Sequence, residues 1–188
     1  MNENLIRYPS ELAPGATVQQ VRKHWERVLW KKVHEMEEEE WRRDCKRKPK
    51  LRTYVTFKEK LELENYLLSE KEKQGRYLLT RLRTGTNRLR IETGRIQRPI
   101  LKPQERVCLQ CNGGEIEDEK HFLLRCPHFR ELRKEMFNSI QEKVGMDLES
   151  RSEEQQWKAL MGQESTPGQL SDIVKKFVRK AMKERTAP

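Results

Sequence analysis

The chain has 188 residues, of which 34% are hydrophobic and 37% are charged. This composition leaves little apolar material for a core, so we expect extended helices around small cores that depend in part on a metal or a partner. The net charge of +10 favours a polyanionic partner, either nucleic acid or an acidic membrane surface. No apolar run approaches the ~20 residues of a membrane span, and no signal peptide is visible. We therefore expect an intracellular protein, nuclear or cytoplasmic and not secreted.

Residues 1–17 show little periodicity and are interpreted as a loose lead-in. Thr17 and Gln20 have the spacing of a capping box. From Val18 to Trp41 the apolar residues recur in steps of three and four, which predicts a long amphipathic helix. We expect its tryptophans to lie in a core, because tryptophans at helical spacing are more often buried than stacked on bases.

A basic cluster at residues 42–52 follows, and Pro49 is expected to end the helix there. Its arginines Arg42, Arg43 and Arg47 are candidate contacts to a phosphate backbone. Cys45 lies inside the cluster but is far in sequence from the other cysteines, so it is expected to be a bystander.

Two more helices are predicted, from Phe57 to Leu68 and from Tyr77 to Leu82, the second ending before Gly85. An arginine arm at residues 83–98 comes next, and its glycines argue against a continuous helix. The guanidinium group can grip phosphate oxygens with two hydrogen bonds, so we interpret the arm as a nucleic-acid contact. The alternative is a basic loop that is merely solvated. The arginines concerned are Arg83, Arg88, Arg90, Arg95 and Arg98.

Residues 108–126 carry the spacing of a zinc knuckle: Cys108-x-x-Cys111, nine residues, then His121 and Cys126 with four residues between them. Three thiolates and one imidazole form a closed tetrahedral set, which suits structural Zn²⁺. The alternative is a set of free cysteines at chance spacing. His128 could compete with His121, but the gap to Cys126 favours His121.

The acidic residues between 115 and 119 are expected to form a negative loop that a phosphate backbone avoids. A helix from about residue 120 to residue 140 would carry Arg130 and Arg133 away from it as a positive track. Beyond Gly145 a polar stretch, a short helix at Trp157 and a last amphipathic helix with a basic face are predicted. That basic face suits nucleic acid, a membrane surface or an acidic partner, or only improves solubility.

The predicted fold is mainly α, with helical segments around a small Cys3His zinc knuckle and a loop-rich arginine arm. We expect four regions. They are the lead-in at 1–17, a helical region at 18–84, the arm, knuckle and following helix at 85–145, and a polar linker with a C-terminal basic helix at 146–188.

The stretch from Lys50 to Glu135, under half of the chain, resembles the C-terminal zinc-binding region of non-LTR, LINE-like retrotransposon reverse transcriptases. The likeness rests on Lys50-Leu-Arg-Thr-Tyr, Tyr66-Leu-Leu, the arginine segment 81–95, the two cysteine motifs with the acidic residues before His121, and Arg130 to Arg133. It implies a region that helps to hold template RNA or target DNA beside a polymerase. A paired-aspartate polymerase motif and an endonuclease constellation are missing from the chain. We therefore expect a fragment or a stand-alone descendant of such an element.

The sequence thus favours a non-catalytic, zinc-stabilised module that binds RNA or DNA. An alternative from another class keeps the zinc as a staple for a helical protein-binding surface, with Trp157 and the last helix meeting a partner chain. An enzyme is not expected, because a saturated Cys3His site leaves the metal no position for water.

Overall fold

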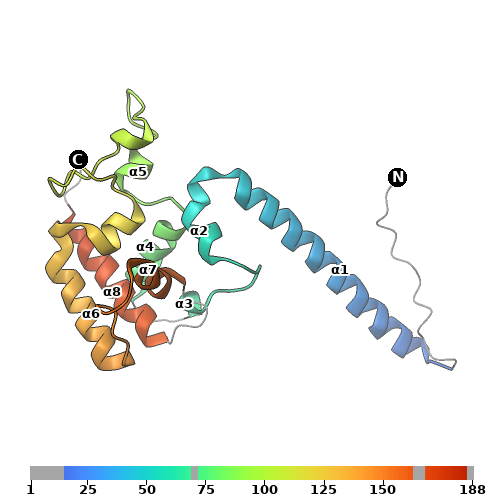
Figure 1. Cartoon of the computed structure of the whole chain (residues 1–188). Helices are drawn as coiled ribbons and strands as arrows, with labels where there is room; N and C mark the ends of the chain where they lie inside the picture. The colour runs from blue at the N-terminus through green and yellow to red at the C-terminus, as the bar shows by residue number, and fades with distance from the viewer. Residues whose placement is uncertain (1–14, 69–71, 163–167, 186–188) are drawn as a thin grey trace. The chain divides into compact units, whose positions relative to one another are not determined.

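The computed structural model describes residues 15–68, 72–162 and 168–185, so most of the expected lead-in lies outside the described residues. Within these ranges the regular backbone is helical, and the only β-pairing is an isolated antiparallel bridge between Val107 and Ile116. The predicted mainly α class is confirmed. The chain divides into two compact units, residues 1–44 and 45–188 (Figure 1).

The α-helices are α1 (Val18–Arg47), α2 (Arg52–Phe57), α3 (Asn65–Leu68), α4 (Lys73–Arg83), α5 (Arg90–Thr93), α6 (Arg130–Val144), α7 (Glu153–Gly162) and α8 (Gly168–Glu184). Short 3₁₀ turns cover Pro49–Leu51, Pro103–Glu105 and Pro127–Phe129, and a π-helical turn covers His121–Arg125. No helix in the described ranges combines the length and the apolar character needed to cross a bilayer.

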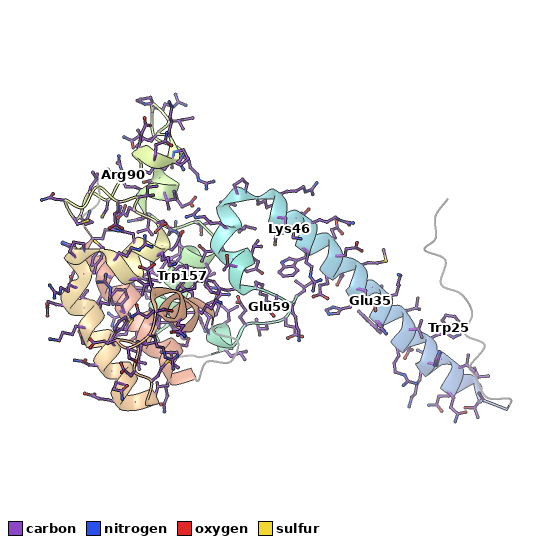
Figure 2. The ribbon with its side chains drawn as sticks, viewed as in Figure 1. Trp25, Glu35, Lys46, Glu59, Arg90 and Trp157 are labelled. Carbon is purple, nitrogen blue, oxygen red and sulfur yellow. The ribbon has the colours of Figure 1, made fainter. Side chains whose placement is uncertain are left out.

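The first unit consists, in its described part, of most of α1. Its capping box forms as predicted: the Thr17 amide donates to Gln20 Oε1 at 2.8 Å, and the Gln20 amide donates to Thr17 Oγ1 at 3.4 Å. Side chains project along the whole helix (Figure 2). Trp30 is 73% exposed, and Cys45 is the one buried residue of α1. The expected burial of Trp30 is wrong, because the described part of the first unit offers no second element against which this side chain could pack.

The core of the second unit forms where α4, α6 and α8 meet. Leu82 of α4, Ile140 of α6 and Val178 of α8 are all fully buried. Helices α4 and α8 approach closely at Gly75, where an added Cβ would lie 2.4 Å from the Lys175 carbonyl oxygen. The stretches 85–145 and 146–188, expected as separate regions, therefore contribute to one shared core.

The predicted helix from Phe57 to Leu68 is wrong as a continuous element. Helix α2 ends at Phe57, Lys58 takes an extended conformation, and α3 starts only at Asn65. The break brings Glu64 to Arg83, with which it forms a buried ion pair. The demand of a buried charge for a partner thus outweighs the helical periodicity of this stretch.

The helix predicted around Tyr77 is confirmed as α4. It ends at Arg83, and Gly85 follows with a φ of +60°. A Cβ at Gly85 would lie 2.0 Å from the Lys50 carbonyl oxygen, so glycine is required both by the backbone conformation and by the space.

Helix α7 packs on α2 through an aromatic pair. The rings of Trp157 and Phe57 lie edge to face at 5.5 Å, and Trp157 is only 8% exposed. The apolar face of α8 is also buried in the core. Trp157 and that face therefore stabilise the unit and are not available to a partner chain in this conformation.

Candidate metal centre and basic groove

The knuckle, residues 108–126, begins with a short hairpin. The Cys108 amide donates to the Glu115 carbonyl at 2.8 Å, and the Glu117 amide donates to the Arg106 carbonyl at 2.9 Å. These bonds flank the bridge between Val107 and Ile116. The hairpin turn between them carries Cys108 and Cys111, and Gly114 takes a positive φ of 65° within it.

The second half of the ligand set depends on the π-helical turn His121–Arg125. In an ordinary α-helix, residues five apart would point about 140° away from each other. Here the Cys126 amide donates to the His121 carbonyl at 2.7 Å, the wider i→i+5 bond of a π turn. Asp118 caps this turn by accepting the His121 amide at 2.7 Å. The wide turn brings His121 and Cys126 to the same side.

The four predicted ligands converge. Their ligand atoms all lie within 4.8 Å of one another. Cys108 Sγ lies 3.9 Å from Cys126 Sγ, and Cys111 Sγ lies 3.5 Å from His121 Nε2. A tetrahedral ion with metal–sulfur bonds near 2.3 Å and metal–nitrogen bonds near 2.05 Å requires edges of about 3.8 Å and about 3.5 Å. The two edges agree with this geometry, so the cluster can hold a metal ion.

Electrostatics of the cluster also fit a metal. Burial raises the pKa of the Cys108 thiol, and it raises the pKa of Cys126 to about 12. Thiolates in this site therefore need a cation beside them, and metal binding would release their protons. Glu115 Oε2 lies 3.2 Å from His121 Nδ1, which leaves Nε2 to face the sulfur atoms. A carboxylate on the far nitrogen is the usual support of a metal-bound imidazole.

Cys45 and His128, which the sequence excluded from the metal ligands, lie outside the cluster. His128 is exposed, and its ring packs edge-on against Phe129 at 4.8 Å. The histidine that lies with the three cysteines is His121 and not His128.

Two of the acidic residues between 115 and 119, Glu117 and Glu119, are buried and hold other parts of the unit. Glu117 is 1% exposed and accepts two hydrogen bonds from Arg185, at 2.8 and 2.9 Å, and one from the Arg90 amide at 2.7 Å. Glu119, also buried, accepts from Arg52 at 2.7 Å and from Asn87 at 2.9 Å.

Burial raises the pKa of Glu119, and the Arg52 guanidinium opposes that rise. These carboxylates thus connect the knuckle to the rest of the unit.

Two arginines expected to contact nucleic acid are structural. Arg83 is fully buried, pairs with Glu64 and donates to the Met161 carbonyl, so it is closed to a phosphate. Arg133 is half-buried and donates at 2.8 Å to the carbonyls of Leu123 and Cys126, which supports the knuckle backbone.

The remaining arm arginines divide by exposure. Arg90 and Arg95 are half-buried, and Arg95 lies 3.3 Å from Glu92. Arg88 and Arg98 are exposed. The arm is also less loop-like than expected, because α5 (Arg90–Thr93) forms inside it.

The other candidates are exposed. Arg130 stands at the start of α6, and the basic cluster contributes Arg42, Arg43 and Arg47 from the last turns of α1. Arg42 pairs with Glu38 at 2.8 Å, within its own helix.

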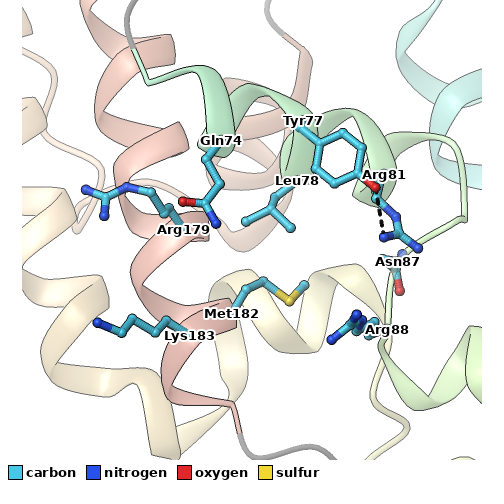
Figure 3. A pocket seen from close by; sticks show the side chains of 9 residues that line it. All are labelled: Gln74, Tyr77, Leu78, Arg81, Asn87, Arg88, Arg179, Met182 and Lys183. Carbon is cyan, nitrogen blue, oxygen red and sulfur yellow. Dashed lines mark hydrogen bonds between the residues drawn. The ribbon is translucent and has the colours of Figure 1, made fainter.

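A groove that the sequence interpretation missed lies between α4 and α8 (Figure 3). It encloses about 630 Å³. Its nine lining residues are Gln74, Tyr77, Leu78, Arg81, Asn87, Arg88, Arg179, Met182 and Lys183. In the sequence, the only hint of the groove is an aromatic and a basic residue four positions apart on one helix, Tyr77 and Arg81. That they line a cavity depends on the packing of α8.

Comparison with protein-family models, with curated proteins and with solved structures finds no match.

Proposed function

We propose that the second unit is a non-catalytic, zinc-stabilised module that binds nucleic acid. Three cysteines and one histidine, whose ligand atoms lie within 4.8 Å of one another, are the donor set that Zn²⁺ prefers in structural sites. All four positions are filled by protein atoms, so the ion would have no open position for a water or a substrate. Its role would be to fix the backbone.

The observation that carries nucleic-acid binding is the connection from the knuckle to an exposed arginine. Glu117 accepts the Arg90 amide and Glu119 accepts the Asn87 side chain, so both ends of the segment 87–90 are held by the knuckle. Arg88, between them, is exposed, and no carboxylate of the described residues pairs with it. An exposed guanidinium on a segment that is held in place, with no carboxylate partner among the described residues, is suited to a phosphate oxygen.

The net charge of +10 and the resemblance of residues 50–135 to the zinc-binding region of LINE-like reverse transcriptases support the same proposal. Under it the exposed arginines Arg98 and Arg130, with the basic cluster of α1, would add sequence-independent contacts. The half-buried Arg90 and Arg95 would contribute less.

The test is a titration of the full, zinc-loaded chain with RNA and with DNA at two salt concentrations. We expect binding whose affinity falls as salt rises, because each neutralised phosphate releases counterions. Chelation of the metal should weaken this binding. No binding to either nucleic acid at the lower salt concentration would contradict the proposal.

One observation supports a second candidate function, a zinc-stapled module that binds a protein. Helix α1 exposes Leu29, Trp30, Val33 and Met36. The chain would then bind a protein through α1 and not, as the sequence suggested, through Trp157 and the C-terminal helix. Deletion of residues 1–44 separates the two candidates, because nucleic-acid binding by the second unit should persist without them.

A further inference from the structure

The groove between α4 and α8 combines an exposed aromatic ring with an apolar floor. Tyr77 is 59% exposed although it lies in a concave surface. Leu78 and Met182 line the same space from the two helices (Figure 3). The Arg81 guanidinium lies 5.5 Å from the Tyr77 ring centroid and donates to its hydroxyl at 3.2 Å. These contacts hold the ring in place while much of it stays open to a ligand.

The charge of the groove has one sign. Four of its nine described lining residues are cationic, and none is acidic. Arg179 is compensated by Glu72 at 2.9 Å, and Arg81 is also held by the Thr86 carbonyl at 2.6 Å. Arg88 and Lys183 are exposed and have no carboxylate partner among the described residues. These two cations are therefore available to an anionic ligand.

Both walls of the groove are attached to one buried carboxylate. Glu117 accepts the Arg90 amide, two residues beyond Arg88. It also accepts both hydrogen bonds of Arg185, two residues beyond Lys183. Glu119 of the knuckle also holds the Asn87 side chain, which lines the groove. The knuckle therefore holds the chain segments that carry Arg88 and Lys183.

We infer that this groove binds a single-stranded segment of nucleic acid, with one unpaired base stacked on Tyr77 and its phosphates held by Arg88 and Lys183. The inference rests on the proposed function and adds the surface and the form of the ligand. Aromatic rings beside basic side chains are the usual platform for single strands, since every base offers a flat face. A duplex keeps its bases stacked on one another, which would leave Tyr77 without a partner. The volume of about 630 Å³ suits a ligand of roughly nucleotide size.

The experiment measures fluorescence anisotropy of a labelled oligouridylate of about 12 nucleotides, a length that one binding fold covers. A duplex of the same length is measured in parallel, and the full zinc-loaded chain is used throughout. Tyr77→Ala should weaken single-strand binding about 5-fold to 150-fold, the range of one lost stacking contact. Tyr77→Phe should restore it, because the ring face remains.

Arg88→Gln and Lys183→Gln should each lower the log–log salt slope for the single strand by about 0.7. The matched controls are Arg151→Gln and Lys158→Gln, which change exposed side chains outside the groove and should leave the slope unchanged. Zinc content and helical circular dichroism of every variant establish that the unit is folded.

The outcomes separate the two proposals. If the wild type binds and Tyr77→Ala binds equally well, the groove assignment is overturned while the proposed function stands. If the wild type binds no nucleic acid, both are overturned. A duplex that binds more tightly and with the same dependence on Tyr77 would overturn the single-strand form. Equal competition by an oligoglutamate peptide would assign the groove to an acidic protein partner.

Discussion

Basic side chains are paired with buried carboxylates around the knuckle, whereas in the groove between α4 and α8 some of them are exposed without such a partner among the described residues. Around the knuckle, Arg185 is buried with Glu117 as its partner. In the groove, Lys183, only two positions earlier, is exposed and faces no acidic side chain among the lining residues. Arg83 and Arg88 make the same contrast, since the first pairs with Glu64 and the second stands open. The available carboxylates, more than the arginines themselves, decide which cations are left for a ligand.

The largest effect should come from the metal ligands. A Cys111→Ser, Cys126→Ser double variant should lose the metal, and the lost binding free energy is on the order of 10 kcal/mol in small zinc modules. Amide hydrogen exchange should then show lost protection around residues 105–130, while α1 keeps its own. His128→Ala, outside the cluster, should retain one metal per chain. Stoichiometric zinc in the double variant would contradict the assignment.

The contrast between Arg83 and Arg88 can be tested with one matched substitution. Arg83→Met should lower the free energy of unfolding by about 3–5 kcal/mol, because it leaves the buried Glu64 carboxylate without its partner. Arg88→Met should change stability by no more than about 0.5 kcal/mol, as expected for an exposed side chain. Urea denaturation measures both. If the two variants lost similar amounts of unfolding free energy, the division into structural and exposed arginines would be contradicted.

Glu117 connects the two regions, so its neutralisation should affect both. Glu117→Gln should lower the free energy of unfolding by about 1.5–3 kcal/mol, the range for hydrogen bonds to a charged group. It should also weaken oligonucleotide binding, because Glu117 holds Arg90 and Arg185. Each of these lies two residues beyond one of the two groove cations, Arg88 and Lys183. Glu149→Gln, at an exposed position, is the control for thermal unfolding and anisotropy. Unchanged or tighter binding by Glu117→Gln would contradict this connection and would agree with the expectation that a phosphate backbone avoids the acidic residues.

The smallest effect concerns a surface ion pair beside the knuckle. Hydrogen bonds from Arg125, at 2.7 and 2.8 Å, lower the pKa of Glu153 to about 2. Because the folded pKa lies below the unfolded value of 4.5, the pair stabilises the fold above pH 4.5. That contribution is lost as the pH falls through the folded pKa.

Its size should stay below about 1 kcal/mol, since both side chains are partly exposed. An NMR titration of Glu153 tests the shift, and Arg125→Gln should return its pKa toward the ordinary range. A Glu153 titration near pH 4.5 in the wild type would contradict the assignment.

Short-range patterns allowed much of this structure to be predicted. The capping box at Thr17, helix α4 with Gly85 after it, and the four residues that could hold a metal ion all follow from spacings within about twenty residues. The helical class follows from apolar periodicity, which α8 shows most clearly because its apolar face is buried.

Long-range pairing accounts for the failures. Glu64 meets Arg83 and Glu117 meets Arg185, 19 and 68 positions apart, and no local pattern signals either contact. From the sequence alone, Arg83 was therefore interpreted as a phosphate contact, and Glu117 as part of a negative loop. The groove was missed for the same reason, since Tyr77 and Lys183 face it from distant helices.

The most direct measurement is photo-cross-linking of the zinc-loaded chain to a single-stranded oligonucleotide that carries 5-iodouracil, followed by peptide mass spectrometry. Stacking of a base on Tyr77 predicts that the cross-linked tryptic peptide is the one from Tyr77 to Arg81, and that Tyr77→Leu abolishes it. A main cross-link at Trp25 or Trp30 of α1, with the Tyr77 peptide unmodified, would contradict the account.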